Sequence, residues 1–363
     1  MRISGFRFGR LRIPLKTPFR SAIRDIDAID DVVIMIDTDA GNVGYGSAPT
    51  VLRTMGETHR SIIDAIRHGI EPHITGMDIS NLNQITTRVQ QSLVRNHSAK
   101  SAVEIAVYDL FGQLHDAPLY KLLGGGVPRL STDFTISVDY IDKMVSDSLK
   151  TVEQGFDAIK VMAGKDVGLD IKRVEAIYAA IGDQALIRLD GNEGWKPKEA
   201  LVAIRELEAR GIPLELVEQP VAGHDREGLR YVAERVSTPI LTDEAIQSPL
   251  DAIELIRMRA ADMINIKLGR LGGISNAIKI ADIASLHNVE CMAGCVTESS
   301  ISVAAAAHVA VAKANIITKI DLDAPALSKS NPVKCGAVFD GPTITITDAP
   351  GLGVEAIDGL EML

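Results

Sequence analysis

Four charged residues end successive apolar segments, and their side chains could together support metal-assisted proton transfer. Asp190 ends ALIRLD, Glu218 ends LELVE, Asp243 ends PILTD and Lys267 ends MINIK. The intervals are 28 residues from 190 to 218, 25 from 218 to 243 and 24 from 243 to 267, each the length of one strand–helix unit. Three carboxylates brought together repel one another unless a cation lies between them, and their oxygens suit Mg²⁺.

Taken singly, each of these carboxylates could simply begin a loop or cap the following helix. Three of them in consecutive units, followed by a lysine in the fourth, favour one shared site. A lysine can act as a base when its neighbours depress its pKa, and a metal or a second lysine would do this.

The elements that would position these residues alternate between strand and helix. Helical patterns, for example at 197–211 and 274–287, separate short apolar segments. This alternation predicts a parallel α/β barrel, in which successive strand ends surround one opening. An open doubly wound sheet is less favoured, because no Gly-x-Gly-x-x-Gly follows the first strand. The predicted barrel strands are 134–139, 158–162, 185–190, 214–218, 239–243, 263–267, 289–294 and 317–321.

The first 125 residues have a different pattern, which indicates a separate α+β capping domain. Gly124-Gly125-Gly126 and Pro128 interrupt the helical pattern and mark the predicted boundary. We therefore predict a capping domain at 1–125, completed by the C-terminal segment 325–363, and a catalytic barrel at 126–324. The predicted elements of the capping domain are strands at 2–15 and 32–38 and helices at about 57–70 and 98–115.

The composition limits the classes of function. The chain has 363 residues, 46% of them apolar, and a net charge of −10, which argues against a nucleic-acid surface. No apolar run approaches the roughly 20 residues of a membrane span. Three cysteines cannot all pair with one another, so we expect a reduced, cytoplasmic protein. We expect a small-molecule substrate, no nucleic-acid or membrane partner, and a homo-oligomer.

Several motifs resemble those of a known family across nearly the whole chain. RLDGNEGW, VEQPV, LTDEA and INIKLGRLGG resemble the muconate-lactonising subgroup of the enolase superfamily, as do PLKTPFRSAIR near the start and MAGCVTES and DLDAP near the end. The closest resemblance is to dipeptide epimerases, including L-Ala-D/L-Glu epimerases. It implies a modified (β/α)7β TIM-type barrel with an α+β capping domain. It also implies Mg²⁺ bound by Asp190, Glu218 and Asp243, with Lys267 as an acid/base that removes a proton α to a carboxylate and forms an enediolate.

One catalytic position departs from the family pattern. The family carries a Lys-x-Lys pair on the second barrel strand, and the matching residues here are Lys160, Val161 and Met162. Lys160 matches the first lysine, an electrostatic partner and carboxylate contact. Met162 replaces the second lysine, which in the family is the acid/base opposite Lys267. Methionine cannot carry a proton at neutral pH, so the resemblance implies that one catalytic group is missing.

Residues expected to bind the substrate follow from the same resemblance. Asp321 and Asp323, two apart at the end of the eighth predicted strand, would hold the α-ammonium group of a dipeptide. Arg24 matches a loop that covers the substrate, where it could bind an acidic side chain. Thr135 and Cys295 match strand ends that line the pocket. Without the resemblance, Asp321 and Asp323 could be solvated loop acids and Arg24 a solvated surface residue, while Thr135 and Cys295 would more often be packing residues.

Three readings of the function therefore stay open. The first is epimerisation of dipeptides such as Ala-Glu, impaired by Met162. The second is a one-base lyase or cycloisomerase of the o-succinylbenzoate synthase or muconate cycloisomerase type, although Asp321 and Asp323 argue against substrates without an ammonium group. The third is a non-catalytic, metal-dependent binding protein, or a disabled variant in which Met162 replaces a lysine.

Overall fold

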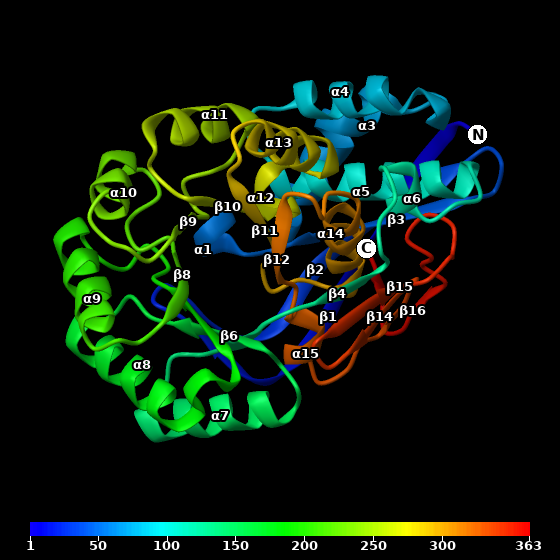
Figure 1. The fold of residues 1–363 in the computed structure, drawn as a ribbon. Coiled ribbons are helices and arrows are strands. Elements are labelled where there is room, and N and C mark those ends of the chain that lie inside the picture. The colour runs from blue at the N-terminus through cyan, green and yellow to red at the C-terminus, as the bar shows by residue number, and fades with distance from the viewer.

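The computed structural model describes residues 1–363, and its largest sheet is a barrel of eight parallel strands (Figure 1). The strands follow the chain in order from β5 to β12. Between the two ends of the sheet, the Asp133 N–H donates to the Ile320 carbonyl at 3.2 Å. The predicted barrel is thus confirmed. The strands are β5 (Phe134–Ile136), β6 (Ala158–Met162), β7 (Leu186–Asp190), β8 (Leu214–Glu218), β9 (Ile240–Thr242), β10 (Met263–Lys267), β11 (Glu290–Gly294) and β12 (Ile317–Asp321).

Helices connect the strands and cover the outside of the barrel (Figure 1). Helix α9 is typical: Pro197 occupies its first turn, and Ala200, Ala203, Ile204 and Leu207 recur at helical spacing and are buried. The helices are α7 (Ile141–Glu153), α8 (Val167–Ile181), α9 (Pro197–Ala209), α10 (Arg226–Ala233), α11 (Pro249–Met258), α12 (Leu268–Leu271), α13 (Ile274–Leu286), α14 (Ser300–Ala312) and α15 (Ala324–Leu327), with the 3-10 turn η3 (Gly182–Gln184).

The N-terminal region forms an antiparallel sheet, with strand order β17-β1-β2-β3, and helices packed against it. β1 and β2 form a hairpin much longer than the predicted strands, and its loop at 21–24 contributes to the pocket described below. The elements are β1 (Ile3–Arg20), β2 (Asp25–Thr38), β3 (Val43–Pro49), α1 (Leu52–Met55), α2 (His59–Ala65), η1 (Ile66–Ile70), α3 (Glu71–Ile74), η2 (Ile79–Asn81), α4 (Leu82–Ser92), α5 (His97–Leu114) and α6 (Leu119–Leu122).

One helix differs from its prediction. The segment 57–70 was expected as one α-helix, but the α-helical part ends at Ala65 and a π-helical turn follows over Ile66–Ile70. Pro72 has no N–H to donate to the carbonyl of His68, so the regular α-helical pattern cannot continue through this point. The helix expected at 98–115 is present as α5.

The C-terminal tail returns to the N-terminal half of the chain. β17 (Glu361–Met362) pairs with β1, and β15 (Thr343–Ile346) pairs with β4 (Arg129–Ser131). β4 lies just after the predicted domain boundary at 125, which stays a prediction. The remaining strands of the tail are β13 (Val333–Lys334), β14 (Ala337–Asp340) and β16 (Ala356–Ile357). None of the helices has the length and apolar character needed to cross a lipid bilayer.

A buried polar cluster joins the N-terminal sheet to the barrel beside the site. Asp31 on β2 accepts a hydrogen bond from the Ser299 N–H at 2.8 Å, and Ser302 on α14 donates to the Ser47 carbonyl at 3.1 Å. Burial raises the pKa of Asp31 to about 7 and that of Glu298 to about 8, and the charge of Asp31 adds to the rise at Glu298. The cluster therefore fixes the sheet against the segment that leaves β11.

Candidate active site

The four charged residues lie together at the carboxyl ends of successive strands, at one end of the barrel, as predicted. Asp190 is paired in register with Glu218, and Met162 with Asp190, so the ends of β6, β7 and β8 are level. Asp243 follows β9 directly, and Lys267 ends β10. All of these side chains are buried, with Glu218 fully inaccessible to solvent.

The ammonium group of Lys267 lies between two of the carboxylates. Its Nζ is 3.0 Å from Asp243 Oδ2 and 3.4 Å from Glu218 Oε1. Burial alone would lower the pKa of Lys267, but the charges of Asp243 and Glu218 outweigh it and raise that pKa above its ordinary value. A divalent cation that neutralised the carboxylates would oppose this effect.

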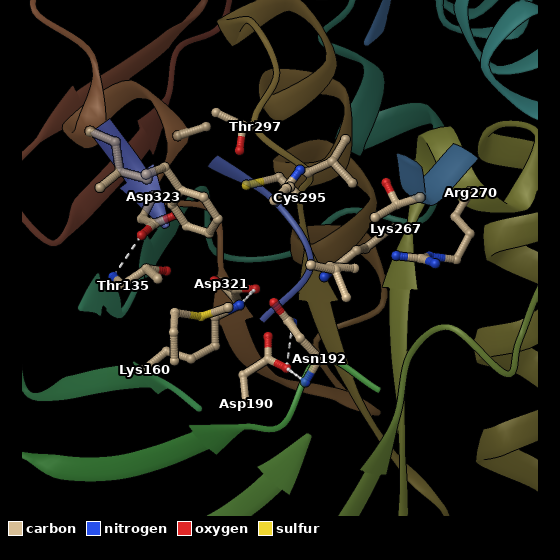
Figure 2. A pocket seen from close by; sticks show the side chains of 18 of the residues that line it. Thr135, Lys160, Asp190, Asn192, Lys267, Arg270, Cys295, Thr297, Asp321 and Asp323 are labelled. Atoms are coloured by element: carbon tan, nitrogen blue, oxygen red, sulfur yellow. Dashed lines mark hydrogen bonds and ion pairs between the residues drawn. The ribbon is translucent and has the colours of Figure 1, made fainter. Parts of the chain in front are cut away.

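Lys160 occupies the other side of Glu218. Its Nζ is 3.5 Å from Glu218 Oε2 and forms a close ion pair with Asp321 on β12 (Figure 2). Burial would lower the pKa of Lys160, but Asp321 and Glu218 raise it well above its usual range. The two lysines thus compensate the buried carboxylates in this structure.

The carboxylates of Asp190, Glu218 and Asp243 supply the oxygen donors that a hard cation prefers, but they are not arranged as a metal site in this structure. No group of three or more Asp, Glu, His or Cys side chains is arranged to hold a metal ion, and the ammonium group of Lys267 lies between Glu218 and Asp243. However, Glu218 Oε2 and Asp243 Oδ1 are buried without a hydrogen-bond partner. Such oxygens are costly to bury, and coordination of Mg²⁺ would satisfy them. The residues present therefore fit this metal.

Asp190 and Asp243 have opposite electrostatic surroundings. Burial, reinforced by Glu218, raises the pKa of Asp190 to about 7. Burial would also raise the pKa of Asp243, but Arg270 and Lys267 outweigh it and lower that pKa to about 2. Arg270 Nη2 lies 3.2 Å from Asp243 Oδ2.

Two further carboxylates, Asp321 and Asp323, line the same pocket (Figure 2). Asp323 Oδ2 accepts a hydrogen bond from the Thr135 N–H at 2.7 Å. Burial and then the charge of Asp321 raise the pKa of Asp323 to about 6. Thr135 thus contacts Asp323, one member of this pair, through its backbone N–H. Asp321 is already paired with Lys160, so a cationic ligand would mainly compensate Asp323.

The predicted pocket residues Arg24 and Cys295 also line this cavity, as does Met162. The Arg24 guanidinium carbon lies 4.8 Å from the centre of the Phe19 ring, a cation–π contact, and Arg24 Nη1 is buried without a hydrogen-bond partner. Burial raises the pKa of the Cys295 thiol well above its usual range, and Asp321 and Asp323 add to this effect, so the thiol stays protonated.

Several residues that contact the predicted site were not identified from the sequence. Asn192 donates to Asp190 Oδ1 at 2.7 Å through its side chain, and Asn265 donates to Glu218 Oε1 at 2.7 Å. Arg270 binds Asp243 and also Glu244, at 3.2 Å. Their strings, DGNEGW, INIK and LGR, were part of the resemblance. Their spacing of two or three residues from Asp190 and Lys267 is the signal that could have indicated them.

The comparisons with known proteins agree across both halves of the chain. Residues 8–124 match the family described as mandelate racemase / muconate lactonizing enzyme, N-terminal domain. Residues 143–359 match the family described as enolase C-terminal domain-like. The L-Ala-D/L-Glu epimerase of Clostridium acetobutylicum is 47% identical to this chain over 358 residues, which are 99% of this chain and 100% of that protein.

Solved structures of similar proteins have the same fold. The substrate-liganded complex of the L-Ala-D/L-Glu epimerase from Bacillus subtilis has a TM-score of 0.96 and 40% identity, covering 98% of this chain and 99% of that chain. The dipeptide epimerase from Enterococcus faecalis, complexed with Mg and the dipeptide L-Leu-L-Tyr, has a TM-score of 0.94 and 37% identity, covering 98% of this chain and 100% of that chain.

Proposed function

Because the chain belongs to the mandelate racemase/muconate lactonizing enzyme family of the enolase superfamily, we propose that it is a Mg²⁺-dependent dipeptide epimerase framework with one of its two acid/base groups replaced. Similar proteins are named as dipeptide epimerases, and three solved structures of such epimerases hold Mg and a dipeptide. The observation that carries the proposal is the single pocket that Lys267, Asp190, Asp321 and Asp323 line together.

We assign the metal to Asp190, Glu218 and Asp243. Bound there, Mg²⁺ supplies Lewis-acid stabilisation of the negative charge that develops on the substrate carboxylate during proton removal. The unpartnered oxygens of Glu218 and Asp243 support this assignment, as does the level register of Asp190 and Glu218. Asn192 and Asn265 hold two of the carboxylates by hydrogen bonds and restrict their rotation.

Proton transfer at the α-carbon depends on Lys267 and on position 162. Lys267 Nζ, in its neutral amine form, removes the proton from one face of the α-carbon to become an ammonium group, and then returns the proton to that face. Epimerisation also requires proton delivery to the opposite face, and Met162 has no proton to deliver. Lys160 is held by Asp321 and Glu218, so its ammonium contributes positive charge beside the substrate carboxylate.

The two ends of the pocket select the substrate. Asp321 and Asp323 bind the α-ammonium group of a dipeptide, which compensates their charge. Arg24 binds an acidic side chain at the C-terminal residue, because its buried Nη1 lacks a partner and Phe19 holds the guanidinium in place. Glu244, the acid whose charge most affects the pKa of Arg24, is already paired with Arg270. No specific observation favours the lyase or cycloisomerase reading.

Removal of one proposed metal ligand should abolish strong Mg²⁺ binding. Glu218→Gln keeps the shape of the side chain but removes its charge. We expect Mg²⁺ affinity to fall by more than about 100-fold, because loss of a residue that only orients a metal ligand already costs up to about 100-fold. Isothermal titration calorimetry measures this. Glu215→Gln, on the same strand, is the matched control and should bind Mg²⁺ as the parent does. Equal affinity in Glu218→Gln and the parent would contradict the metal assignment.

The ammonium site should give a pH-dependent preference for free dipeptides over N-acetyl dipeptides. Asp323 is protonated below about pH 6, so its attraction for the ammonium is present above that pH and is lost as the pH falls through about 6. An α-amino group has a pKa of about 7.7–8.0, so most of the dipeptide keeps its ammonium charge up to pH 7.5.

The measurement is the ratio of the two dissociation constants between pH 5 and pH 7.5, which cancels the pH dependence of the metal site shared by both ligands. We expect the preference to grow by up to about tenfold per pH unit until about pH 6. Asp323→Asn should flatten the curve. A ratio near one at every pH would remove the reason for assigning a dipeptide.

Arg24 should make the pocket prefer an acidic C-terminal residue. A hydrogen bond to a charged group is worth about 1.5–3 kcal/mol, so we expect L-Ala-L-Glu to bind about 10- to 100-fold more tightly than L-Ala-L-Gln. Arg24→Met keeps an apolar contact with Phe19 and should erase the difference. The control is Arg20→Met, because Arg20 is half-exposed and pairs with Asp25 and Asp139. A preference for L-Ala-L-Lys would instead indicate that Glu244 governs this end of the pocket.

Met162 should separate deprotonation from inversion. In D₂O we expect the chain to exchange the α-proton of one stereoisomer with little inversion, because one positioned acid/base is worth about 10²–10⁴-fold in rate. NMR and chiral chromatography measure the two processes. Met162→Lys should restore inversion of the same substrate.

Two variants serve as controls for this experiment. Met162→Leu, which also lacks a proton, should behave like the parent, and Lys267→Met should abolish exchange. Inversion at an ordinary rate in the parent would contradict the role given to position 162. The absence of exchange from every dipeptide tested would favour the non-catalytic binding protein.

A further inference from the structure

Gln219, the residue after Glu218, has a backbone conformation that glutamine rarely adopts. Its φ is +30°, and its side chain is fully buried. Positive φ is uncommon outside glycine and persists only where the surrounding contacts impose it. The contacts of Gln219 identify what imposes it.

The backbone of Gln219 connects the ends of three strands. Its N–H donates to the Leu241 carbonyl on β9 at 2.9 Å, and its carbonyl accepts from the Glu193 N–H, beyond β7, at 2.9 Å. The adjacent carbonyl of Glu218 accepts from the Gly191 N–H at 2.9 Å. The peptide units at 218–219 are therefore tied both to the segment that follows Asp190 and to the strand that precedes Asp243.

The side chain of Gln219 also contacts the segment that contains Asp243, directly after β9. Its Oε1 accepts from the Asp243 N–H at 2.8 Å and from the Ala245 N–H at 3.3 Å. Its Nε2 donates to the Val221 carbonyl at 2.9 Å. N–H donors on one side and a carbonyl on the other define the orientation of the amide and use both of its ends.

We propose that Gln219 is a positioning residue that fixes the Glu218 carboxylate relative to the backbone of Asp243. It thereby sets the distance between the Glu218 and Asp243 carboxylates that coordination of a divalent cation requires. The inference rests on the proposed metal site. A buried glutamine that only closed a loop would have no need to bind the N–H of one ligand while lying next to another. If this side chain is lost, the two strand ends can shift independently, although the carboxylates themselves are retained.

The test compares Gln219→Met, which has similar length but no hydrogen bonds, with Gln184→Met. Gln184 is an exposed residue that also donates from Nε2 to a carbonyl, so it controls for the loss of one such bond far from the site. Mn²⁺ affinity is measured by electron paramagnetic resonance on protein that circular dichroism shows to be folded. A merely structural glutamine would change the unfolding midpoint but not the metal affinity of the folded protein.

We expect Gln219→Met to weaken Mn²⁺ binding by about 10- to 100-fold, the range typical of residues that orient metal ligands, and Gln184→Met to leave it unchanged. If Gln219→Met does not fold, Gln219→Asn is judged by the same measure, because its amide is one methylene too short to keep these contacts together. Folded Gln219 variants that bind Mn²⁺ within about twofold of the parent, while Glu218→Gln does not bind, would overturn the positioning role alone. Unchanged binding in Glu218→Gln would overturn the metal site as well.

Discussion

The burial of several carboxylates at one end of the barrel is the constraint on which the rest of the site depends. Glu218 is fully inaccessible to solvent, with Asp190 beside it in register. A charge so far from water must be compensated by other charges and hydrogen bonds, or it will be neutralised. In this structure Lys267 and Lys160 lie on either side of Glu218 and provide that compensation. Their positions therefore follow from the same electrostatic requirement that makes the site suitable for a divalent cation.

The fold holds the carboxylates next to one another through backbone contacts between neighbouring strands. Parallel strands in register bring the charged residues to one level, and hydrogen bonds between consecutive strand ends hold that level. The N-terminal hairpin then supplies Arg24 and Phe19 from the side opposite the barrel, and the buried contact of Asp31 with Ser299 holds its sheet against α14. Recognition is thus divided: the barrel carries the groups proposed for chemistry, and the loop of the hairpin carries the group proposed for side-chain selection.

The sequence was sufficient to predict the barrel and the residues at its strand ends, because both follow from regular periodicity. Each of the eight predicted strands overlaps an observed one, and the spacing of Asp190, Glu218 and Lys267 reflects the repeat of one strand and one helix. The residues that hold the site could not be predicted in this way. The role of Gln219 depends on a left-handed backbone and on contacts with a neighbouring strand, neither of which leaves a periodic pattern. Likewise, the contact of Thr135 with Asp323 uses a backbone N–H that any residue would provide.

In the proposed function, substrate binding and turnover impose different requirements on position 162. Its side chain is almost fully buried and lies beside Asp190, where a neutral thioether fills space without needing a counter-ion or a hydrogen-bond partner. The carboxylates proposed for the metal, the aspartates proposed for the ammonium group and Arg24 are all retained. The absence of a cation at position 162 also leaves more of the negative charge of Asp190 uncompensated, which favours occupancy by a divalent cation. In the proposed function, the groups that hold a substrate remain in place while one face of its α-carbon has no group to exchange a proton with, so we expect substitution at this one position to affect the rate of inversion far more than affinity.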